Sequence, residues 1–234
     1  MANVVVVGSY GKMGSLMCNA IKESKNYNLL YGVDILADGE EKNIYNNLDI
    51  KYGLPDVIID FSNADALVDI IDFAVFHNTK LIIATTGHSE CGNKLVTQAS
   101  EKIAIFKSEN FSFGMNVLVE ELKTFSKKLI GYDTEILECH KKYKKDYPSG
   151  TAIMLKNIIK QHSINSPAII PIHSIRIGDV AGMHTIIFGG TGELIELKHT
   201  VLDRSVFVNG VIKALYFIQN KSKGLYNMND LIKM

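Results

Sequence analysis

One stretch near the middle of the chain carries residue types that could bind an anion and move a proton. Its first part sets one histidine and four lysines between two acids, as Glu138-Cys139-His140-Lys141-Lys142-Tyr143-Lys144-Lys145-Asp146. An imidazole can accept or donate a proton near neutral pH, which suits general acid–base chemistry. The lysines add local positive charge, so the preferred partner of this stretch is an anion.

The residues after this stretch predict the start of a helix. Tyr147-Pro148 interrupts the chain, and Ser149-Gly150-Thr151 then precedes a periodic apolar run over 153–159. Small and hydroxyl residues are typical of helix N-termini. The free N–H groups and partial positive charge of a first helical turn favour a carboxylate. The alternative is a solvated basic loop followed by a capped helix, and this stretch alone leaves both open.

Composition narrows the class of protein. The 234 residues are 47% hydrophobic, and 25 basic side chains balance 25 acidic ones. A neutral folded chain does not fit a nucleic-acid-binding surface, which is usually strongly basic. The three cysteines are scattered, without metal-ligand spacing, which predicts reduced thiols and no metal site. We expect a cytoplasmic protein with no signal peptide and no membrane span.

The N-terminus predicts a nucleotide site. A β-branched run over 4–7 reads as a buried parallel strand, and Gly8-Ser9-Tyr10-Gly11-Lys12-Met13-Gly14 separates it from a helical pattern. A second strand over 29–33 ends at Asp34, 20 positions after Gly14 (34 − 14), where an acid can meet the adenosine ribose. Tyr10 displaces the middle glycine of the usual G-x-G-x-x-G pattern. A purely structural turn is the alternative to dinucleotide binding.

Alternating strands and helices continue to residue 111. Strands are predicted over 57–61, 81–84 and 103–106, with helices over 64–76 and 89–100 between them. This order predicts a parallel, Rossmann-type sheet. Ligands of such sheets lie at the carboxyl ends of the strands, here near Asp34, Thr85-Thr86-Gly87 and Asn110-Phe111.

The second half predicts an inserted α+β domain with an open mixed sheet. Helices are expected over 113–130 and 151–162, and strands over 134–140, 169–176, 184–188 and 193–200. A last helix over 205–220 should pack back on the first domain. The predicted domains are therefore 1–111 with 204–234, for dinucleotide binding, and 112–203, for substrate binding and oligomerisation. We expect Ile186, Phe188, Leu194 and Leu197 on an open face that self-association covers.

These motifs resemble the dihydrodipicolinate reductase family, whose members reduce 4-hydroxy-tetrahydrodipicolinate in lysine biosynthesis. The family signature E-x-H-H-x-x-K-x-D-x-P-S-G-T-A is similar to residues 138–152. The displaced glycine pattern G-x-x-G-[RK]-M-G matches residues 8–14. Further similarity lies at 84–87, 110–116, 174–179, 184–185 and 224–226.

The resemblance implies a reaction and residues that perform it. Hydride from NAD(P)H would reduce 4-hydroxy-tetrahydrodipicolinate, a ring dicarboxylate, to tetrahydrodipicolinate in the diaminopimelate route to lysine. His140 takes the position of the proton donor and acceptor, and Lys144 that of the proton-donating lysine. Lys141, Ser149, Gly150 and Thr151 match substrate-binding positions. The family also implies a homotetramer formed through the open sheet.

The resemblance also implies the cofactor contacts. Asp34 without a neighbouring cation favours an unphosphorylated ribose, so we expect NADH to be preferred over NADPH. Lys12 is the nearby charge that could accommodate the extra phosphate. The matching positions are Gly8, Ser9, Tyr10, Gly11, Lys12, Met13, Asp34, Ala84, Thr85, Thr86, Ser108, Glu109, Asn110 and Phe111.

Three departures from the family pattern keep alternatives open. Lys141 replaces the second histidine, Tyr147 replaces a small residue, and the segment between Asp34 and Val57 is short. A nucleotide-binding paralogue with lost or altered reductase activity is therefore one alternative. A two-domain dehydrogenase of the aspartate or homoserine type is another, which the signature over 138–152 disfavours.

Overall fold

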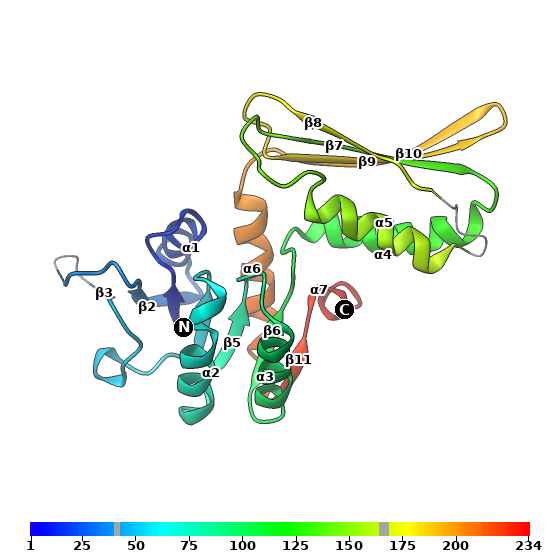
Figure 1. Ribbon diagram of the computed structural model, residues 1–234. Helices are drawn as coiled ribbons and strands as arrows, with labels where there is room; N and C mark the ends of the chain where they lie inside the picture. The colour runs from blue at the N-terminus through cyan, green and yellow to red at the C-terminus, as the bar shows by residue number, and fades with distance from the viewer. Residues whose placement is uncertain (40–42, 164–168) are drawn as a thin grey trace. The chain divides into compact units, whose positions relative to one another are not determined.

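A computed structural model describes residues 1–39, 43–163 and 169–234 of the chain. The chain forms two compact units (Figure 1). The first comprises Met1–Phe111 with Phe207–Met234, and the second comprises Ser112–Val206.

The first unit contains a seven-stranded parallel sheet in the order β11-β6-β5-β4-β1-β2-β3. This confirms the predicted Rossmann-type sheet. The edge strands β3 and β11 were not predicted, because two or three residues carry no readable periodicity. The strands are β1 (Ala2–Val7), β2 (Tyr27–Val33), β3 (Ile44–Tyr45), β4 (Val57–Asp60), β5 (Lys80–Ile83), β6 (Ala104–Lys107) and β11 (Gly224–Tyr226).

Helices cover both faces of this sheet. On one face, Val5, Ile58 and Ile83 are fully buried in a cluster that α2 and α3 complete. On the other, Phe106 of β6 meets Phe217 of α6 edge-on, with ring centroids 5.7 Å apart. Strands buried on both faces need continuous apolar runs, which is what the sequence shows. The elements are α1 (Lys12–Lys22), η1 (Ile50–Tyr52), η2 (Ala64–Ala66), α2 (Leu67–Phe76), α3 (Glu90–Ser100), α6 (Ser205–Ile218) and α7 (Met228–Ile232).

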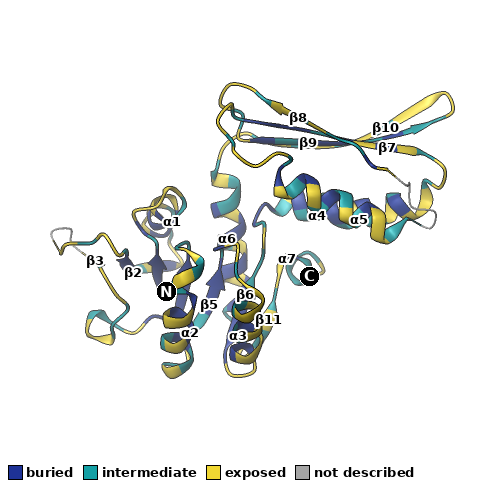
Figure 2. Cartoon of the chain, viewed as in Figure 1, coloured by how far each residue is buried: buried dark blue, intermediate teal, exposed yellow. Residues whose placement is uncertain are grey.

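The second unit contains a four-stranded mixed sheet in the order β10-β9-β7-β8. Strand β7 pairs parallel with β8 and antiparallel with β9, so the predicted open mixed sheet is confirmed. Helices α4 and α5 lie along one face, buried on the side toward the sheet (Figure 2). The elements are α4 (Phe113–Lys128), β7 (Asp133–His140), α5 (Gly150–His162), β8 (Ile172–Arg176), β9 (Gly182–Gly190) and β10 (Glu193–Val201).

The predicted membership of the open face is wrong for three of four residues. Ile186 and Phe188 are 0% and 1% exposed and belong, with Leu197 packed against them, to the core under α4 and α5. Leu194 is 70% exposed. Side chains alternate along a strand, so Leu194 and Leu197, an odd number of positions apart, cannot share a face. A hairpin pattern separates two faces but does not say which one the helices cover.

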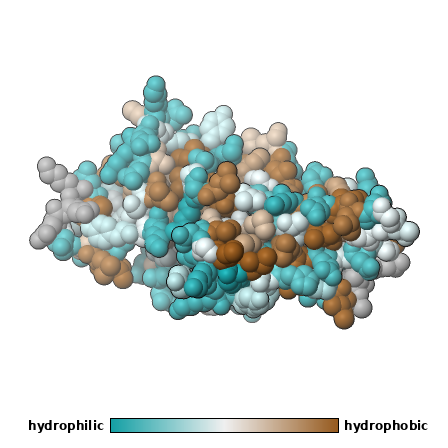
Figure 3. Space-filling view, turned by 90° about the horizontal axis from the view of Figure 1, so that it is seen from above, coloured by the Kyte–Doolittle hydropathy of each residue, from teal (hydrophilic) through white to brown (hydrophobic). Residues whose placement is uncertain are grey.

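The face opposite α4 and α5 carries a mixture of apolar and charged side chains. Met183 and Ile187 are half-buried, while Leu194 and Lys198 are exposed. The space-filling view, which looks onto this side of the sheet, shows apolar patches separated by hydrophilic side chains (Figure 3). Among the residues described, no helix combines the length and apolar character needed to cross a membrane.

Candidate functional site

The turn after β1 is built around two glycines. Gly8 has φ +80°, and a Cβ there would lie 2.5 Å from the carbonyl oxygen of Phe61. A Cβ on Gly14 would overlap the carbonyl oxygen of Gly8. Helix α1 begins after Gly11 without a side-chain cap, so the N–H groups of its first turn face a potential anion. This is a cradle that fits a nucleotide pyrophosphate.

Asp34 at the end of β2 is tied to this turn. Its Oδ2 accepts the N–H of Tyr10 at 3.0 Å, and its Oδ1 accepts the N–H of Leu36 at 3.1 Å. The N–H groups of Gly8 and Ser9 both donate to the Val33 carbonyl oxygen. Hydrogen bonds therefore connect the turn after β1 and Asp34 at one edge of the parallel sheet.

The remaining predicted cofactor residues lie on the same edge of the sheet. Ala84 follows β5 and donates its N–H to the Asp60 carbonyl oxygen at 3.0 Å. Ser108 follows β6, and its hydroxyl donates to the Asn110 carbonyl oxygen at 3.1 Å. Because β6, β5, β4, β1 and β2 are consecutive in the sheet, these strand ends are neighbours. The structure brings together Gly8–Met13, Asp34, Ala84–Thr86 and Ser108–Phe111.

Asp60 is a residue of this edge that the sequence interpretation missed. It is fully buried at the end of β4. Burial raises the pKa of its carboxyl group, opposed by hydrogen bonds from Ser62. Its Oδ1 accepts both the N–H and the hydroxyl of Ser62, at 2.9 and 2.5 Å. Asp60 thus holds the turn after β4, next to the turn after β1. Its signal in the sequence is an acid that ends an apolar run.

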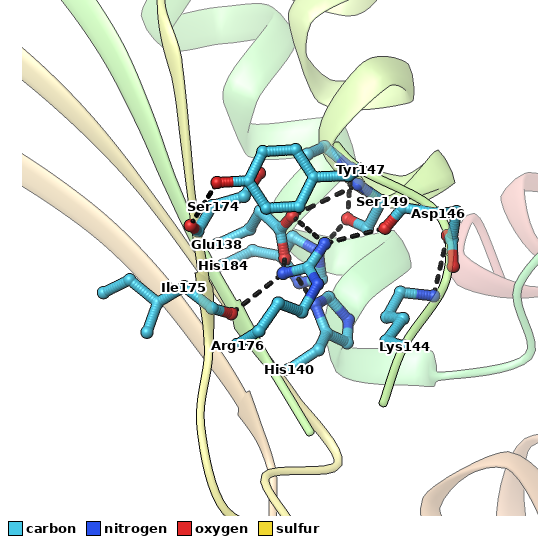
Figure 4. Close-up of polar contacts among 11 residues, drawn as sticks. Glu138, His140, Lys144, Asp146, Tyr147, Ser149, Ser174, Ile175, Arg176 and His184 are labelled. Carbon is cyan, nitrogen blue, oxygen red and sulfur yellow. Dashed lines mark hydrogen bonds and ion pairs between the residues drawn. The ribbon is translucent and has the colours of Figure 1, made fainter. Parts of the chain in front are cut away.

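In the second unit, a buried charge cluster surrounds Glu138 (Figure 4). The two terminal guanidinium nitrogens of Arg176, Nη1 and Nη2, donate to this carboxylate at 2.9 and 2.7 Å. His140 Nδ1 donates to Glu138 Oε2 at 2.5 Å. Glu138 and His140 are two residues apart on β7, so their side chains share a face, and β8 places Arg176 beside His140.

The cluster keeps Glu138 ionised. Burial by itself would raise the pKa of this carboxyl group, but hydrogen bonds from its donors, Arg176 foremost, lower it to about 2. A carboxylate that is charged at neutral pH and accepts from Nδ1 favours the His140 tautomer with a proton on Nδ1. Nε2 is then free to exchange a proton. A Cβ on Gly182 would lie 3.2 Å from Nε2, so glycine at this position avoids crowding the ring.

Ser149 links the cluster to the first turn of α5. Its hydroxyl accepts the N–H of Ala152 at 3.2 Å, and its own N–H donates to Glu138 Oε1 at 3.2 Å. The hydroxyl also lies 3.0 Å from His184 Nε2. Burial, with repulsion from His140, lowers the pKa of His184 to about 4. His184 is therefore a neutral, buried partner of Ser149.

The other predicted residues lie around this cluster. Lys144 Nζ is 2.7 Å from Asp146 Oδ2, and Lys144 donates its N–H to the Lys141 carbonyl oxygen at 3.1 Å. Nothing lies within 4 Å of a Cβ built on Gly150, so the first turn of α5, which includes Thr151, has open space beside it. The second unit thus brings together an imidazole, a lysine and the start of a helix, whose first residue, Gly150, donates its N–H to the Asp146 carboxylate.

The cluster also has the donor types of a metal site. Within the described ranges, donor atoms of Glu138, His140 and His184 lie within 4.8 Å of one another. Both carboxylate oxygens of Glu138 already accept from Arg176, and that cation opposes a second one. The cluster as it stands therefore does not favour a metal ion.

Sequence reasoning missed three members of the cluster. The signature implies no role for Glu138, and no motif in the sequence predicts chemistry for Arg176 or His184. Arg176 and His184 reach Glu138 and Ser149 from strands 35 or more positions away in sequence. The available signal was the two-residue spacing of Glu138 and His140, which puts both on one face of a strand.

The fold and the glycine-rich edge define a Rossmann-type dinucleotide-binding protein with an inserted mixed-sheet unit. Two family models match almost the whole chain: the N-terminus of dihydrodipicolinate reductase over residues 2–111, and its C-terminus over residues 114–232. The chain belongs to the dihydrodipicolinate reductase family.

Curated relatives support this membership over their full length. A 4-hydroxy-tetrahydrodipicolinate reductase from Thermosipho africanus is 40% identical over 97% of this chain and 96% of the relative. One from Rickettsia rickettsii is 38% identical over 100% of both chains.

Solved structures share the fold at low sequence identity. A dipicolinate-bound dihydrodipicolinate reductase from Paenisporosarcina sp. TG-14 aligns with a TM-score of 0.81 at 24% identity, covering 98% of this chain and 99% of that one. An aspartate dehydrogenase from Thermotoga maritima aligns with a TM-score of 0.54 at 12% identity, covering 94% and 98%. The architecture is therefore also found in dehydrogenases of another name.

Proposed function

We propose that this chain reduces 4-hydroxy-tetrahydrodipicolinate to tetrahydrodipicolinate with a reduced nicotinamide nucleotide. The overall change adds a hydride and a proton to the ring compound and releases water. The observation that carries the proposal is the Glu138–His140 pair, whose carboxylate is joined through Ser149 to the open first turn of α5. This arrangement offers an acid–base group and an anion site in one unit. The family membership supplies the reaction.

The substrate's carboxylates call for cations and N–H donors. The N–H groups of Gly150 and Thr151 begin a helix of 13 residues, whose partial positive charge favours an anion. Ser149, as the cap, fixes the start of that helix. Lys141 adds a positive charge on the loop, in place of the histidine of the family pattern, and is proposed to pair with the second carboxylate.

Proton transfer is assigned to two side chains. His140 holds one proton at Nδ1 through Glu138 and exchanges another at Nε2. Lys144 donates a proton, and its pairing with Asp146 keeps its ammonium group on the loop side of the cluster. The bound nicotinamide nucleotide supplies the hydride.

The cofactor is proposed to be NADH in preference to NADPH. The Asp34 carboxylate accepts the N–H of Tyr10 and so lies beside the turn after β1. The negative charge of Asp34 would repel the 2′-phosphate of NADPH at this position. Ile35 and Leu36, which follow it, are 81% and 75% exposed and carry no charge. We expect kcat/KM for NADH to exceed that for NADPH at least about tenfold, which is about 1.4 kcal/mol of discrimination. A preference for NADPH of the same size would contradict this assignment.

A coupled assay tests the activity directly. Aspartate semialdehyde, pyruvate and dihydrodipicolinate synthase generate the substrate, and oxidation of NADH is followed by its absorbance. We expect oxidation that requires all components, with tetrahydrodipicolinate as the product by mass spectrometry. NADH binding without turnover would instead support a paralogue that lost the reaction, which Lys141 in place of the family histidine favours.

A homotetramer is proposed to form through the sheet face opposite α4 and α5. Leu194 is 70% and Ile175 42% exposed on that face, which also carries the half-buried Ile187. Apolar side chains on an open sheet favour association. Light scattering should give a mass four times the 26.0 kDa of one chain. Leu194→Glu should lower that mass, whereas a monomeric wild type would contradict the proposal.

A further inference from the structure

Tyr147 bridges the lysine-rich loop and strand β8. Its hydroxyl donates to the Ser174 carbonyl oxygen at 2.9 Å, and its ring covers Arg176, whose Cζ lies 4.9 Å from the ring centroid (Figure 4). Tyr147 is 67% exposed, so its side chain is not held by a core. Its position is set by these two contacts.

Arg176 is enclosed on several sides by these contacts. The edge of its guanidinium group donates to both Glu138 oxygens and to the Asp146 carbonyl oxygen, at 2.7 to 2.9 Å. Tyr147 covers a face of the group, and the Arg176 side chain is only 12% exposed. A ring over a guanidinium stabilises the cation and keeps water from it. Removing water strengthens the attraction between Arg176 and Glu138.

Asp146 and Tyr147, which are neighbours in the loop, also connect Arg176 to Lys144. Arg176 holds the main chain at Asp146, and the Asp146 carboxylate binds Lys144 Nζ at 2.7 Å. Tyr147 is the next residue, and its hydroxyl fastens this segment to β8. One exposed side chain is thus connected to His140 through Arg176 and Glu138, and to Lys144 through Asp146.

We propose that Tyr147 is a positioning residue, a clasp that holds the lysine-rich loop on β8 and shields the Arg176–Glu138 pair that orients His140. The family pattern has a small residue at this position, so the clasp is a feature of this chain. The inference rests on the proposed reductase activity for its kinetic test. Its contacts to Ser174 and Arg176 do not depend on that activity.

Two substitutions separate the parts of the clasp. Tyr147→Phe keeps the ring and removes the hydroxyl, and Tyr147→Ala removes both. Tyr143→Ala is the control, because Tyr143 is an 80% exposed tyrosine of the same loop whose ring contacts Lys142. We expect Tyr147→Ala to lower kcat roughly tenfold and Tyr147→Phe about threefold, with KM for NADH unchanged. Tyr143→Ala should stay within about twofold of wild type.

A second readout does not need turnover. Nitrogen–proton NMR of the His140 ring, assigned with His140→Gln, reports which nitrogen carries the proton. We expect Nδ1–H alone in the wild type and in Tyr143→Ala, and a mixture of tautomers in Tyr147→Ala. An inactive wild type would overturn the proposed function while this spectrum still tests the clasp. A His140 spectrum unchanged in Tyr147→Ala, or equal kinetic losses in Tyr147→Ala and Tyr143→Ala, would overturn the clasp.

Discussion

The edge of the parallel sheet and the charge cluster of the mixed sheet use different parts of the chain. At the first, the groups that face a ligand are mainly backbone: the Gly8 turn and the first turn of α1. At the second, side chains from β7, β8 and β9 meet around Glu138 and Ser149. A backbone site depends on where a side chain is absent, whereas a side-chain site depends on partners that must all be present.

This difference predicts unequal sensitivity to substitution. In the cluster, removing one partner leaves another charge buried and unpaired. At the turn, adding a methyl group causes a local clash and backbone strain. The largest losses should therefore come from the second unit.

Lys144→Ala should have the largest effect. Loss of a proton donor is expected to lower kcat roughly 10²- to 10⁴-fold, while the dissociation constant for NADH stays the same. Stopped-flow turnover and fluorescence titration with NADH measure the two quantities. Lys145→Ala is the matched control, because Lys145 is the exposed neighbour in the same loop. Equal losses in both variants would show that the loop contributes only general positive charge.

Glu138→Gln should destabilise the second unit by about 3 kcal/mol, because Arg176 then remains buried beside a neutral amide. Glu138 has a pKa lowered to about 2, so its ionised form stabilises the fold above its unfolded pKa. That stabilisation is lost as the pH falls through the folded pKa. Urea unfolding from pH 7 to pH 2 should show a steeper decline for the wild type than for Glu138→Gln.

The control for this variant lies on the same strand. Glu135 is 54% exposed and pairs with His173 on the opposite face. Glu135→Gln should change the free energy of unfolding by less than about 1 kcal/mol. A similar cost for both variants would mean that the Glu138–Arg176 pair behaves like a surface ion pair.

Gly8→Ala should have the smallest of the three effects, about 1 to 3 kcal/mol, seen mainly as a raised KM for NADH. Gly131→Ala has the same backbone strain, with φ +82° against +80°, but no atom lies within 4 Å of its Cβ. The difference in the free energy of unfolding between the two variants therefore isolates the contact with Phe61. If Gly8→Ala and Gly131→Ala lowered the free energy of unfolding equally, the turn would be sensitive to backbone strain alone.

In the first unit, the periodic pattern of the chain was sufficient for the central strands and the turn after β1, but not for the short edge strands β3 and β11. Continuous apolar runs predicted the central strands, and glycine positions predicted the turn after β1, because both depend on neighbours in sequence. The helix start at Ser149 was predicted for the same reason and is confirmed, with its hydroxyl capping Ala152. The family signature alone points to His140 and Lys144, and their roles remain predictions.

Only the tertiary structure decided which face of the mixed sheet is covered and what surrounds the signature. Ile186 and Phe188 lie under α4 and α5, although alternation along β9 allowed either face. Arg176 meets Glu138 from 38 positions away, because β7 and β8 pair in parallel with a register that no local pattern encodes. Sequence periodicity determines which residues share a face of one element, and strand register determines which elements place their residues together.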